Sequence, residues 1–545
     1  MRTSTIIAAV VVVVVIIAVL AYLASSGGRG GATATSAAPS TTSAAPTTAP
    51  TTSPTASATS TAGGPTLTIG VTDKVTELDP AMAYDFFTWE IFYNTMSGLV
   101  MYKPGTTELV PALATSWEVK DNGTVWIFHL RHDAKFCDGT PVTAQNVVWS
   151  IQRVMRINGD PAWLVTYFVK NVTALDNYTV EFVLKRPVAY FLALLATPPY
   201  FPVSPKYNPN QVDADQTAGG AGPYCISKFV RDQTIVLTAN PYWYGPQPYY
   251  KTVVIRFYSD SSALRLALQS GEIDIAWRTL SPPDLQALRS SGKFQVIEVP
   301  SMFIRYMVIN TKMINNTLVR QALAAAVCRS QIINVVFNGT MSPLYTMIPA
   351  GMWGAVPVFK QMYGDCNTTL AQQLLQKAGY SPSNKLVIDL WYTPSHYGST
   401  EQDVAALLKQ QLEATGMITV NIRSAEWSTY TDYARKGVME VYLLGWYPDY
   451  LDPDDYMVPF FRTGANSWLG NGYSNPTVDK LLDEASVLVN QTARAQIYAE
   501  VQKIVAQDVP IVPLFQGKLF IVAKPGIKVT VDPTMILRYW LISAS

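Results

Sequence analysis

The sequence predicts an α/β protein that folds as two or more lobes, and three observations lead to this prediction. From residue 67 onward, short β-prone runs alternate with longer amphipathic segments, which is the pattern of α/β folds. The chain has 545 residues, more than one hydrophobic core usually organises. No segment of 20 to 50 residues repeats, so a solenoid or propeller is not indicated. A cleft between lobes is therefore expected.

The first element is an apolar run at residues 6–24, preceded by Arg2. Its length is enough to cross roughly 30 Å of hydrocarbon and exceeds the 7 to 15 residues of an ordinary signal peptide core. We expect it to be a transmembrane anchor, with residues 1–5 in the cytoplasm and the body of the protein outside the cell. A long signal peptide that is cleaved is the alternative.

Residues 25–65 predict a stalk, because almost every residue of 32–65 is Ala, Thr, Ser or Pro. Such a composition cannot bury a core, and it is typical of a glycosylated tether or of a bare disordered linker. Sequons elsewhere in the chain favour an exported glycoprotein. They begin at Asn122, Asn171, Asn177, Asn315, Asn338, Asn367 and Asn490.

A β-hairpin and a capped helix are predicted within residues 111–153. Two β-prone runs flank Asn122 and Gly123, which readily accept the positive φ of a tight turn. Alternate residues of the second run, 125–130, are apolar, so one face of the hairpin belongs to a core. Thr143 then stands where it can cap an amphipathic helix.

The later part of the chain continues the alternation. We expect strands at 252–258 and 272–276, and helices at 262–270, 319–328, 369–378, 401–414, 478–489 and 493–506. Near residues 300–310 and 510–515, β-prone segments adjoin Pro-containing ones, and here we expect the chain to pass between lobes. Two crossings make one lobe discontinuous.

The charge balance and the motifs of the chain exclude several classes of function. The 40 Lys and Arg residues nearly balance the 39 Asp and Glu residues, so the chain has no electrostatic footprint for nucleic acid. The signatures GxSxG, HExxH and GxxxxGK[ST] are absent, so we expect neither an enzyme nor a cofactor. The four cysteines fit no zinc spacing, and outside the cell they can pair in three ways. They are Cys137, Cys225, Cys328 and Cys366.

A series of motifs in fixed order identifies a resemblance to a known family. They are LDPA from residue 78, PALATSWEVKDNGT from 111, KFCDGTPVTAQNVVWSIQR from 135, GAGPYCI from 220, NPYWYG from 240, SGEIDIAW from 270, VRQALAAAV from 319, DYLDPDDY from 449 and GYSNPTVDKLLDEA from 472. Together they resemble the extracellular solute-binding proteins of family 5, which serve peptide-type and nickel-type ABC importers. The resemblance covers roughly residues 66–531.

This resemblance implies a type II periplasmic-binding-protein fold, in which two α/β lobes close on a ligand about a two-segment hinge. Lobe 1 is then expected at 66–303 and 515–545, with an extra subdomain at about 105–215, and lobe 2 at 304–514. The implied function is that of a monomeric substrate-binding component, which captures oligopeptides or dipeptides and delivers them to a permease with separate cytoplasmic ATPase subunits.

The chain departs from the family pattern in two respects. Relatives usually carry His at the position of Cys137 and Asp at that of Cys328, so both cysteines are candidates for disulfide bridges. The apolar run and stalk stand in place of the lipid-anchor cysteine of bacterial relatives, which favours an archaeal-style surface protein.

The best candidate for a binding site is the loop at 445–453, which follows the apolar strand expected at 441–444. The resemblance implies that Asp449 pairs with the α-ammonium group of a peptide, and we expect Trp446 and Tyr447 beside it to contact the ligand. Asp452 is expected to have a structural role in the Pro turn.

The remaining expected ligand contacts are aromatic: Tyr84, Phe86, Trp277, Trp353 and Trp391, with Trp89 nearby. Flat aromatic faces cover peptide side chains and sugar rings alike, so oligosaccharide binding is the alternative function. Binding of a nickel complex comes third, because only His396 offers an imidazole outside the extra subdomain. A peptide also needs a cation for its carboxylate, and the candidates are Arg278, Arg305, Arg423 and Arg462.

Overall fold

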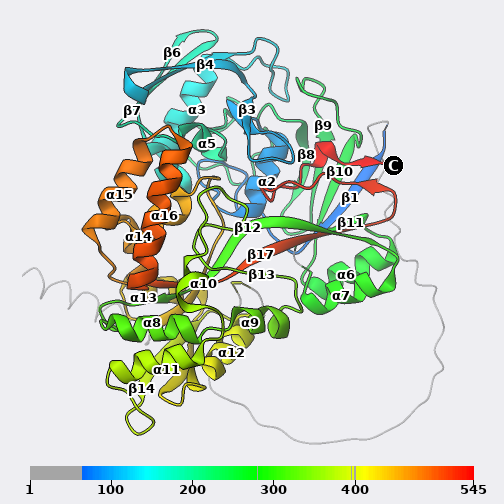
Figure 1. Cartoon of the computed structure of the whole chain (residues 1–545). Helices are drawn as coiled ribbons and strands as arrows, with labels where there is room; N and C mark the ends of the chain where they lie inside the picture. The colour runs from blue at the N-terminus through cyan, green and yellow to red at the C-terminus, as the bar shows by residue number, and fades with distance from the viewer. Residues whose placement is uncertain (1–63, 279, 395, 398–399) are drawn as a thin grey trace, which may run out of the picture. The chain divides into compact units, whose positions relative to one another are not determined.

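The computed structural model describes residues 64–278, 280–394, 396–397 and 400–545 (Figure 1). The chain divides into two units, Met1–Thr59 and Ser60–Ser545. The membrane span expected at 6–24, and nearly all of the stalk expected at 25–65, lie outside the described residues. Within the described part, no helix is both long and apolar enough to cross a membrane.

The centre of the second unit is an 11-stranded mixed sheet. The strand order is β15-β14-β16-β12-β17-β11-β1-β10-β9-β8, and β13 pairs with β17 off this path. The strands are β1 (Thr66–Val71), β8 (Tyr224–Val230), β9 (Thr234–Ala239), β10 (Thr252–Phe257), β11 (Ile275–Trp277), β12 (Gln295–Ile309), β13 (Ser342–Pro343), β14 (Leu386–Tyr392), β15 (Ile418–Ser424), β16 (Val441–Trp446) and β17 (Ile511–Ala523).

Two long antiparallel strands, β12 and β17, join the two halves of this sheet (Figure 1). At one end of this pair, β17 also pairs with β11, and at the other end β12 also pairs with β16. Their register shifts between Pro300 and Ile304. We call β11, β1, β10, β9 and β8 with their helices the first half, and β16, β14 and β15 with theirs the second half. The predicted α/β fold is confirmed, and β12 and β17 are the two segments that connect its halves.

Helices pack on both halves (Figure 1). The first half carries α2 (Phe86–Thr95), α6 (Ser261–Ser270) and α7 (Pro282–Ser291). The second half carries α8 (Thr317–Ala326), α9 (Arg329–Val336), α10 (Val358–Tyr363), α11 (Thr368–Lys377), α12 (Glu401–Glu413), α13 (Trp427–Arg435), α14 (Asp454–Phe461), α15 (Pro476–Val487) and α16 (Gln491–Asp508). Short 3₁₀ turns are η1 (Asp121–Gly123), η2 (Asp160–Ala162), η3 (Pro198–Tyr200), η4 (Ala465–Leu469) and η5 (Tyr539–Leu541).

A separate four-stranded sheet of order β4-β5-β7-β6 contains the predicted hairpin. Its strands are β4 (Ala114–Lys120), β5 (Val125–Leu130), β6 (Val169–Asp176) and β7 (Thr179–Leu184), and it packs with α3 (Ala144–Ile157), α4 (Trp163–Thr166) and α5 (Phe191–Leu195). Two smaller pairs are β2 (Val100–Tyr102) with β3 (Leu109–Pro111), and β18 (Ile527–Lys528) with β19 (Ser543–Ala544).

The details of the hairpin and helix agree with the sequence prediction. Asn122 has φ 54° and Gly123 has φ 90°, as the tight turn requires. Trp126, Phe128 and Leu130 are buried on one face of β5. A capping box between Thr143 and Asn146 opens α3, which satisfies backbone N–H groups that the first helical turn leaves free.

The strand expected at 272–276 is shorter than predicted. Gly271 ends α6 with φ 82°, and the N–H groups of Glu272 and Ile273 turn back to the carbonyl of Ala267. These bonds keep the residues after Gly271 out of the sheet, so the strand β11 begins only at Ile275.

The four cysteines form two disulfides, Cys137–Cys225 and Cys328–Cys366. This is one of the three pairings that the sequence left open, and both positions that depart from the family pattern are bridged. The first bridge joins the loop that follows β5 to strand β8, and its Cα atoms are 5.8 Å apart. It ties the four-stranded sheet to the large sheet.

Candidate functional site

Residues of both halves line a cavity of about 830 Å³. This volume lies within the 300 to 1,000 Å³ typical of small-ligand sites. The first half contributes the segments that follow β1 and β11 and the start of α2, and the second half contributes β12, the segment after β14 and the loop after β16. Segments that follow strand ends are where α/β folds usually bind ligands.

Asp449 lies on the loop after β16, at a contact between the two halves. Its carboxylate accepts a hydrogen bond from the hydroxyl of Tyr84 in the first half, with Tyr84 Oη 2.8 Å from Asp449 Oδ2. The indole of Trp163 in turn donates to that hydroxyl oxygen at 3.2 Å. The carboxylate is thus part of the cavity wall and faces the opposite half.

Asp455, in the first turn of α14, fixes the backbone of this loop. Its Oδ2 atom accepts the N–H of Asp449 and the indole N–H of Trp446, each at 3.0 Å. The Oδ1 atom is buried and has no hydrogen-bond partner among the described residues. A carboxylate near a helix N-terminus is stabilised by the helix dipole, which suits this position.

Burial changes the acidity of both carboxyl groups. It raises the pKa of Asp449 to about 7, against a smaller lowering by the Tyr84 hydroxyl. Burial also raises the pKa of Asp455, and the nearby Asp449 carboxylate adds to this. A cation placed against Asp449 favours its charged form and reverses the shift.

The neighbouring acids of the loop have structural partners. Asp452 forms a buried ion pair with Arg494, with Nη1–Oδ2 and Nη2–Oδ1 distances of 2.9 and 2.6 Å. It also accepts the N–H of Asp454. The expected structural role of Asp452 agrees with this geometry.

Aromatic rings form much of the cavity wall. The ring of Tyr447 lies 5.0 Å from that of Phe303 and 5.6 Å from that of Phe86, so it contacts the first half. The rings of Trp427 and His396 are stacked, with centroids 3.6 Å apart. Burial and the nearby Arg305 lower the pKa of His396 to about 4, so its imidazole is neutral at pH 7.

Two of the four candidate arginines lie in the cavity wall, Arg278 from the first half and Arg305 from β12. The other two lie elsewhere in ion pairs, Arg423 with Asp389 and Arg462 with Asp483. The cavity wall therefore holds the Asp449 carboxylate and the guanidinium groups of Arg278 and Arg305.

The structure brings five of the eight expected site residues together around the cavity: Tyr84, Phe86, Trp446, Tyr447 and Asp449. The three others lie away from it. Trp277 is 1% exposed, and its indole donates to the buried carboxylate of Glu90. Trp353 packs on Tyr498 and Arg494, and Trp391 packs on Tyr433.

Several cavity residues were not expected from the sequence: Asp73, Phe303, Tyr397, Glu401, Trp427 and Lys518. None of them belongs to a motif that sets it apart in the sequence. Asp455, which holds the loop without lining the cavity, lies within the motif DYLDPDDY that the sequence singles out.

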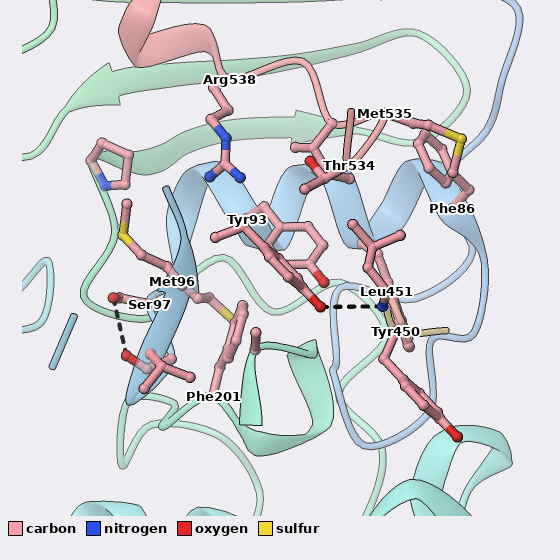
Figure 2. Close-up of a pocket in the computed structure, with 18 of the residues that line it drawn as sticks. Phe86, Tyr93, Met96, Ser97, Phe201, Tyr450, Leu451, Thr534, Met535 and Arg538 are labelled. Carbon is pink, nitrogen blue, oxygen red and sulfur yellow. Dashed lines mark hydrogen bonds between the residues drawn. The ribbon is translucent and has the colours of Figure 1, made fainter. Parts of the chain in front are cut away.

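A second, smaller cavity of about 70 Å³ lies behind the Asp449 loop (Figure 2). It shares Phe86, Trp89, Pro448 and Asp449 with the larger cavity. Within it, the hydroxyl of Tyr102 accepts the N–H of Leu451 at 3.2 Å. A space of this size holds a few water molecules but no peptide.

In the described residues, one group has the composition of a metal site: Cys328, Asp365 and Cys366. Both sulfur atoms belong to the same disulfide, which leaves no thiolate to bind a metal ion.

Comparison with known proteins adds to this geometry. Residues 108–468 match the family described as bacterial extracellular solute-binding proteins, family 5 Middle. The chain is 32% identical over 464 residues to the probable D,D-dipeptide-binding periplasmic protein DdpA of Escherichia coli K12, covering 83% of this chain and 88% of that protein. It is 31% identical over 435 residues to the periplasmic oligopeptide-binding protein OppA of Salmonella typhimurium, covering 74% and 78%.

Solved structures are similar over most of the chain. The periplasmic binding protein DppA of Helicobacter pylori, in complex with the peptide STSA, aligns with a TM-score of 0.75 at 26% identity, over 88% of this chain and 98% of that one. The Escherichia coli murein tripeptide-binding protein MppA aligns with a TM-score of 0.74 at 26% identity, over 89% and 99%.

Proposed function

The chain belongs to the bacterial extracellular solute-binding proteins of family 5, and on this premise we propose that Asp449 holds the α-ammonium group of a peptide in the cavity. Membership makes the protein the substrate-binding component of an ABC importer, with permease subunits as its partners. The observation that carries the proposal is the Asp449 carboxylate, which lies in the cavity wall beside aromatic rings and two guanidinium groups.

Relatives support a peptide as the solute. Two relatives are named as D,D-dipeptide-binding and oligopeptide-binding proteins, and one similar structure contains a bound peptide. A peptide has a cation at one end and an anion at the other, which matches the charges that face the cavity. Charge-assisted hydrogen bonds of this kind are stronger than those between neutral groups.

In the proposed mechanism, the peptide bridges the two halves and stabilises their closed arrangement. Tyr84 and Phe86 come from the first half, and Tyr447 and Asp449 from the second, so a ligand among them contacts both. A ligand shifts a conformational equilibrium only by its differential affinity for the two states. A monomer that closes in this way presents the form that docks on the permease.

We also propose the domain arrangement expected from the sequence. Residues 6–24 anchor the protein in the membrane, and 25–65 hold the binding body outside the cell. Lobe 1 comprises 66–303 and 515–545, with the extra subdomain at about 105–215, and lobe 2 comprises 304–514. The register shift in β12 between Pro300 and Ile304 supports the position of the first crossing.

Small-angle scattering tests lobe closure on a peptide. We expect trialanine to reduce the radius of gyration of the protein, because the lobes close on a bridging ligand. Maltotriose is the matched control of comparable length without ionic ends, and no change is expected. Compaction by maltotriose but not by trialanine would replace the peptide with an oligosaccharide as the solute.

The raised pKa of Asp449 predicts a pH-dependent affinity. The ammonium group binds the carboxylate form, so affinity for trialanine should rise with pH up to about 7, below the range near pH 8 where the peptide's own ammonium group loses its proton. Below about pH 7, the affinity for trialanine should fall by up to tenfold per pH unit. In the ligand-free protein, stability changes with pH in the opposite direction. The folded state holds the Asp449 proton more tightly than the unfolded state does, so the stability that this protonation contributes is lost as pH rises through about 7.

Titration calorimetry between pH 5 and pH 8 checks this prediction. Glu401 and His396 also line the cavity, and Asp455 lies behind its wall. Their titration can change the affinity of any peptide, so the control peptide must be affected by it equally. N-acetylated trialanine is that control, because it lacks only the ammonium group. An equal pH dependence for both peptides would contradict the role of Asp449.

A further inference from the structure

Two buried guanidinium groups in the cavity wall each keep one nitrogen without a partner. The side chain of Arg278 is 9% exposed and that of Arg305 is 10% exposed. In each, the Nη1 atom has no hydrogen-bond partner among the described residues. Both residues line the larger cavity.

The backbone and side chain of Arg278 are firmly held. Its φ is 67°, an uncommon value for a residue with a side chain, and such strain is concentrated at functional positions. Asp73 accepts hydrogen bonds from Nε, at 3.1 Å, and from Nη2. The guanidinium carbon lies 4.4 Å from the ring centroid of Phe86. Three sides of the group are thus occupied, and Nη1 is the remaining donor.

Arg305 is held in a different way. Its guanidinium carbon lies 3.4 Å over the ring of Tyr397. Strand β12 places it opposite Gly445 of β16, where a Cβ atom would come within 2.4 Å of Nη1, so the glycine makes room for the group. Glu401 is its acidic neighbour, at 3.6 Å from Nη2 and beyond hydrogen-bond distance. Burial raises the pKa of Glu401, against a smaller lowering by Arg305.

An unsatisfied donor on a buried guanidinium group is costly, and the cost is removed when an oxygen atom of a ligand accepts from it. Carboxylates suit this role because they accept from the planar fork of Arg. The third cation of the wall, Lys518, is paired with Glu298 at 3.2 Å. Two positions for an anionic oxygen therefore remain, one at Arg278 in the first half and one at Arg305 on β12.

We propose that the preferred solute is an acidic peptide with two anionic groups, an α-carboxylate and one Asp or Glu side chain, which bind separately at Arg278 and Arg305. This inference rests on the proposed function, because Asp449 holds the ammonium group of the same peptide. One guanidinium group belongs to the first half and the other to the long strand that pairs with the second half. Two anions on one ligand therefore favour the closed arrangement.

Titration calorimetry at pH 8 tests the inference with matched tripeptides. Glu is compared with Gln at the second and the third position of alanine tripeptides, each as free acid and as C-terminal amide. In the native protein we expect at least a tenfold preference for Glu over Gln at one position, and a loss of affinity on amidation. Gln keeps the shape of Glu and removes only the charge.

The variants Arg278→Gln and Arg305→Gln assign the two positions. One variant should abolish the preference for Glu, and the other should abolish the effect of amidation. Arg423→Gln is the matched control, because this arginine pairs with Asp389 outside the cavity, and both effects should persist in it. Gly445→Ala keeps both charges but displaces Nη1 of Arg305, so it should reproduce the Arg305→Gln result in weaker form.

Loss of the Arg278 charge leaves Asp73 buried without its partner, so the double variant Asp73→Asn with Arg278→Gln is the alternative if the single variant fails to fold.

Equal binding of Glu and Gln peptides at both positions in the native protein would overturn the inference while leaving peptide binding intact. A preference for Glu that survives in both arginine variants would overturn it too. If no tripeptide with a free amine binds at all, the proposed function itself fails.

Discussion

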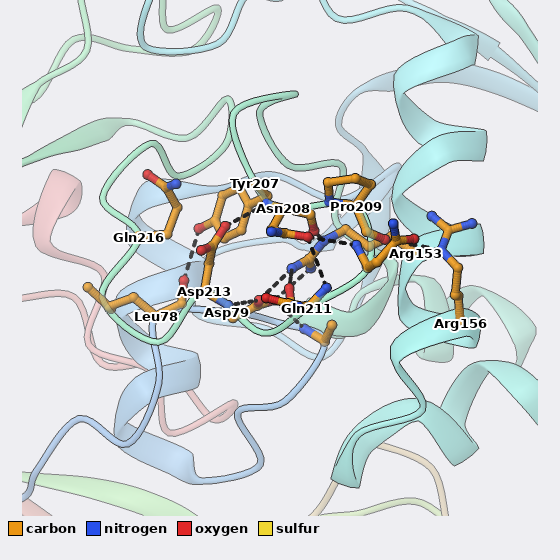
Figure 3. Close-up of polar contacts among 12 residues, drawn as sticks. Leu78, Asp79, Arg153, Arg156, Tyr207, Asn208, Pro209, Gln211, Asp213 and Gln216 are labelled. Atoms are coloured by element: carbon orange, nitrogen blue, oxygen red, sulfur yellow. Dashed lines mark hydrogen bonds and ion pairs between the residues drawn. The ribbon is translucent and has the colours of Figure 1, made fainter.

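Replacing Arg153 by methionine is expected to lower the free energy of unfolding by about 3–5 kcal/mol, because it leaves a buried carboxylate without its partner. Arg153 and Asp79 are 1% and 0% exposed, and they pair through two hydrogen bonds of 2.8 and 2.6 Å (Figure 3). The guanidinium group also donates to the carbonyls of Asn208 and Gln211. This cluster joins the LDPA motif to the end of the helix α3, so it ties the subdomain to the first half.

Chemical denaturation of the native protein and the variant measures this difference. Arg156→Met is the matched control, since Arg156 lies three residues further along α3 and is exposed, with a hydrogen bond to the carbonyl of Pro209 (Figure 3). We expect the control to change the free energy of unfolding by no more than about 0.5 kcal/mol. Equal effects of the two substitutions would show that the buried pair has no special part in holding the subdomain.

Replacing Asp449 by asparagine is expected to weaken the binding of a peptide with a free amine by about tenfold to a hundredfold. A hydrogen bond to a charged group contributes about 1.5–3 kcal/mol, and asparagine removes the charge but retains an acceptor for the Tyr84 hydroxyl. The fold should be unaffected, because the backbone of the loop is held by Asp455.

Calorimetry with trialanine and its N-acetylated form separates this charge effect from a change in the shape of the site. The N-acetylated peptide should bind both proteins with similar affinity. Asp432→Asn provides a surface control, since Asp432 pairs with Lys436 on α13 and does not line the cavity. Unchanged affinity of Asp449→Asn for trialanine would exclude the proposed contact with the ammonium group.

The sequence predicted the fold well where local rules and tertiary structure agree. The hairpin turn at Asn122 and Gly123 and the cap of α3 at Thr143 depend on residues close in sequence, and they appear as expected. The helix expected at 319–328 instead ends at Ala326, and the N–H of Cys328 donates to the side chain of Gln411 on α12. A contact between residues so far apart cannot be seen in a local pattern.

The same limit applies to the site. Asp449 was expected because it follows an apolar strand in a recognised motif, and the structure places it in the cavity wall. Trp277 looked equivalent, but its indole donates to Glu90, which lies 187 residues away in the sequence. Among the arginines, the distant acid that each one meets decides its place: Arg423 pairs with Asp389 and Arg462 with Asp483, both outside the cavity.

Mass spectrometry of the solute that co-purifies with the native protein tests the central claim most directly. We expect a set of peptides with free amino termini, present with the native protein and depleted with Asp449→Asn prepared in parallel. A ladder of hexose units, or peptides retained equally by both proteins, would contradict it.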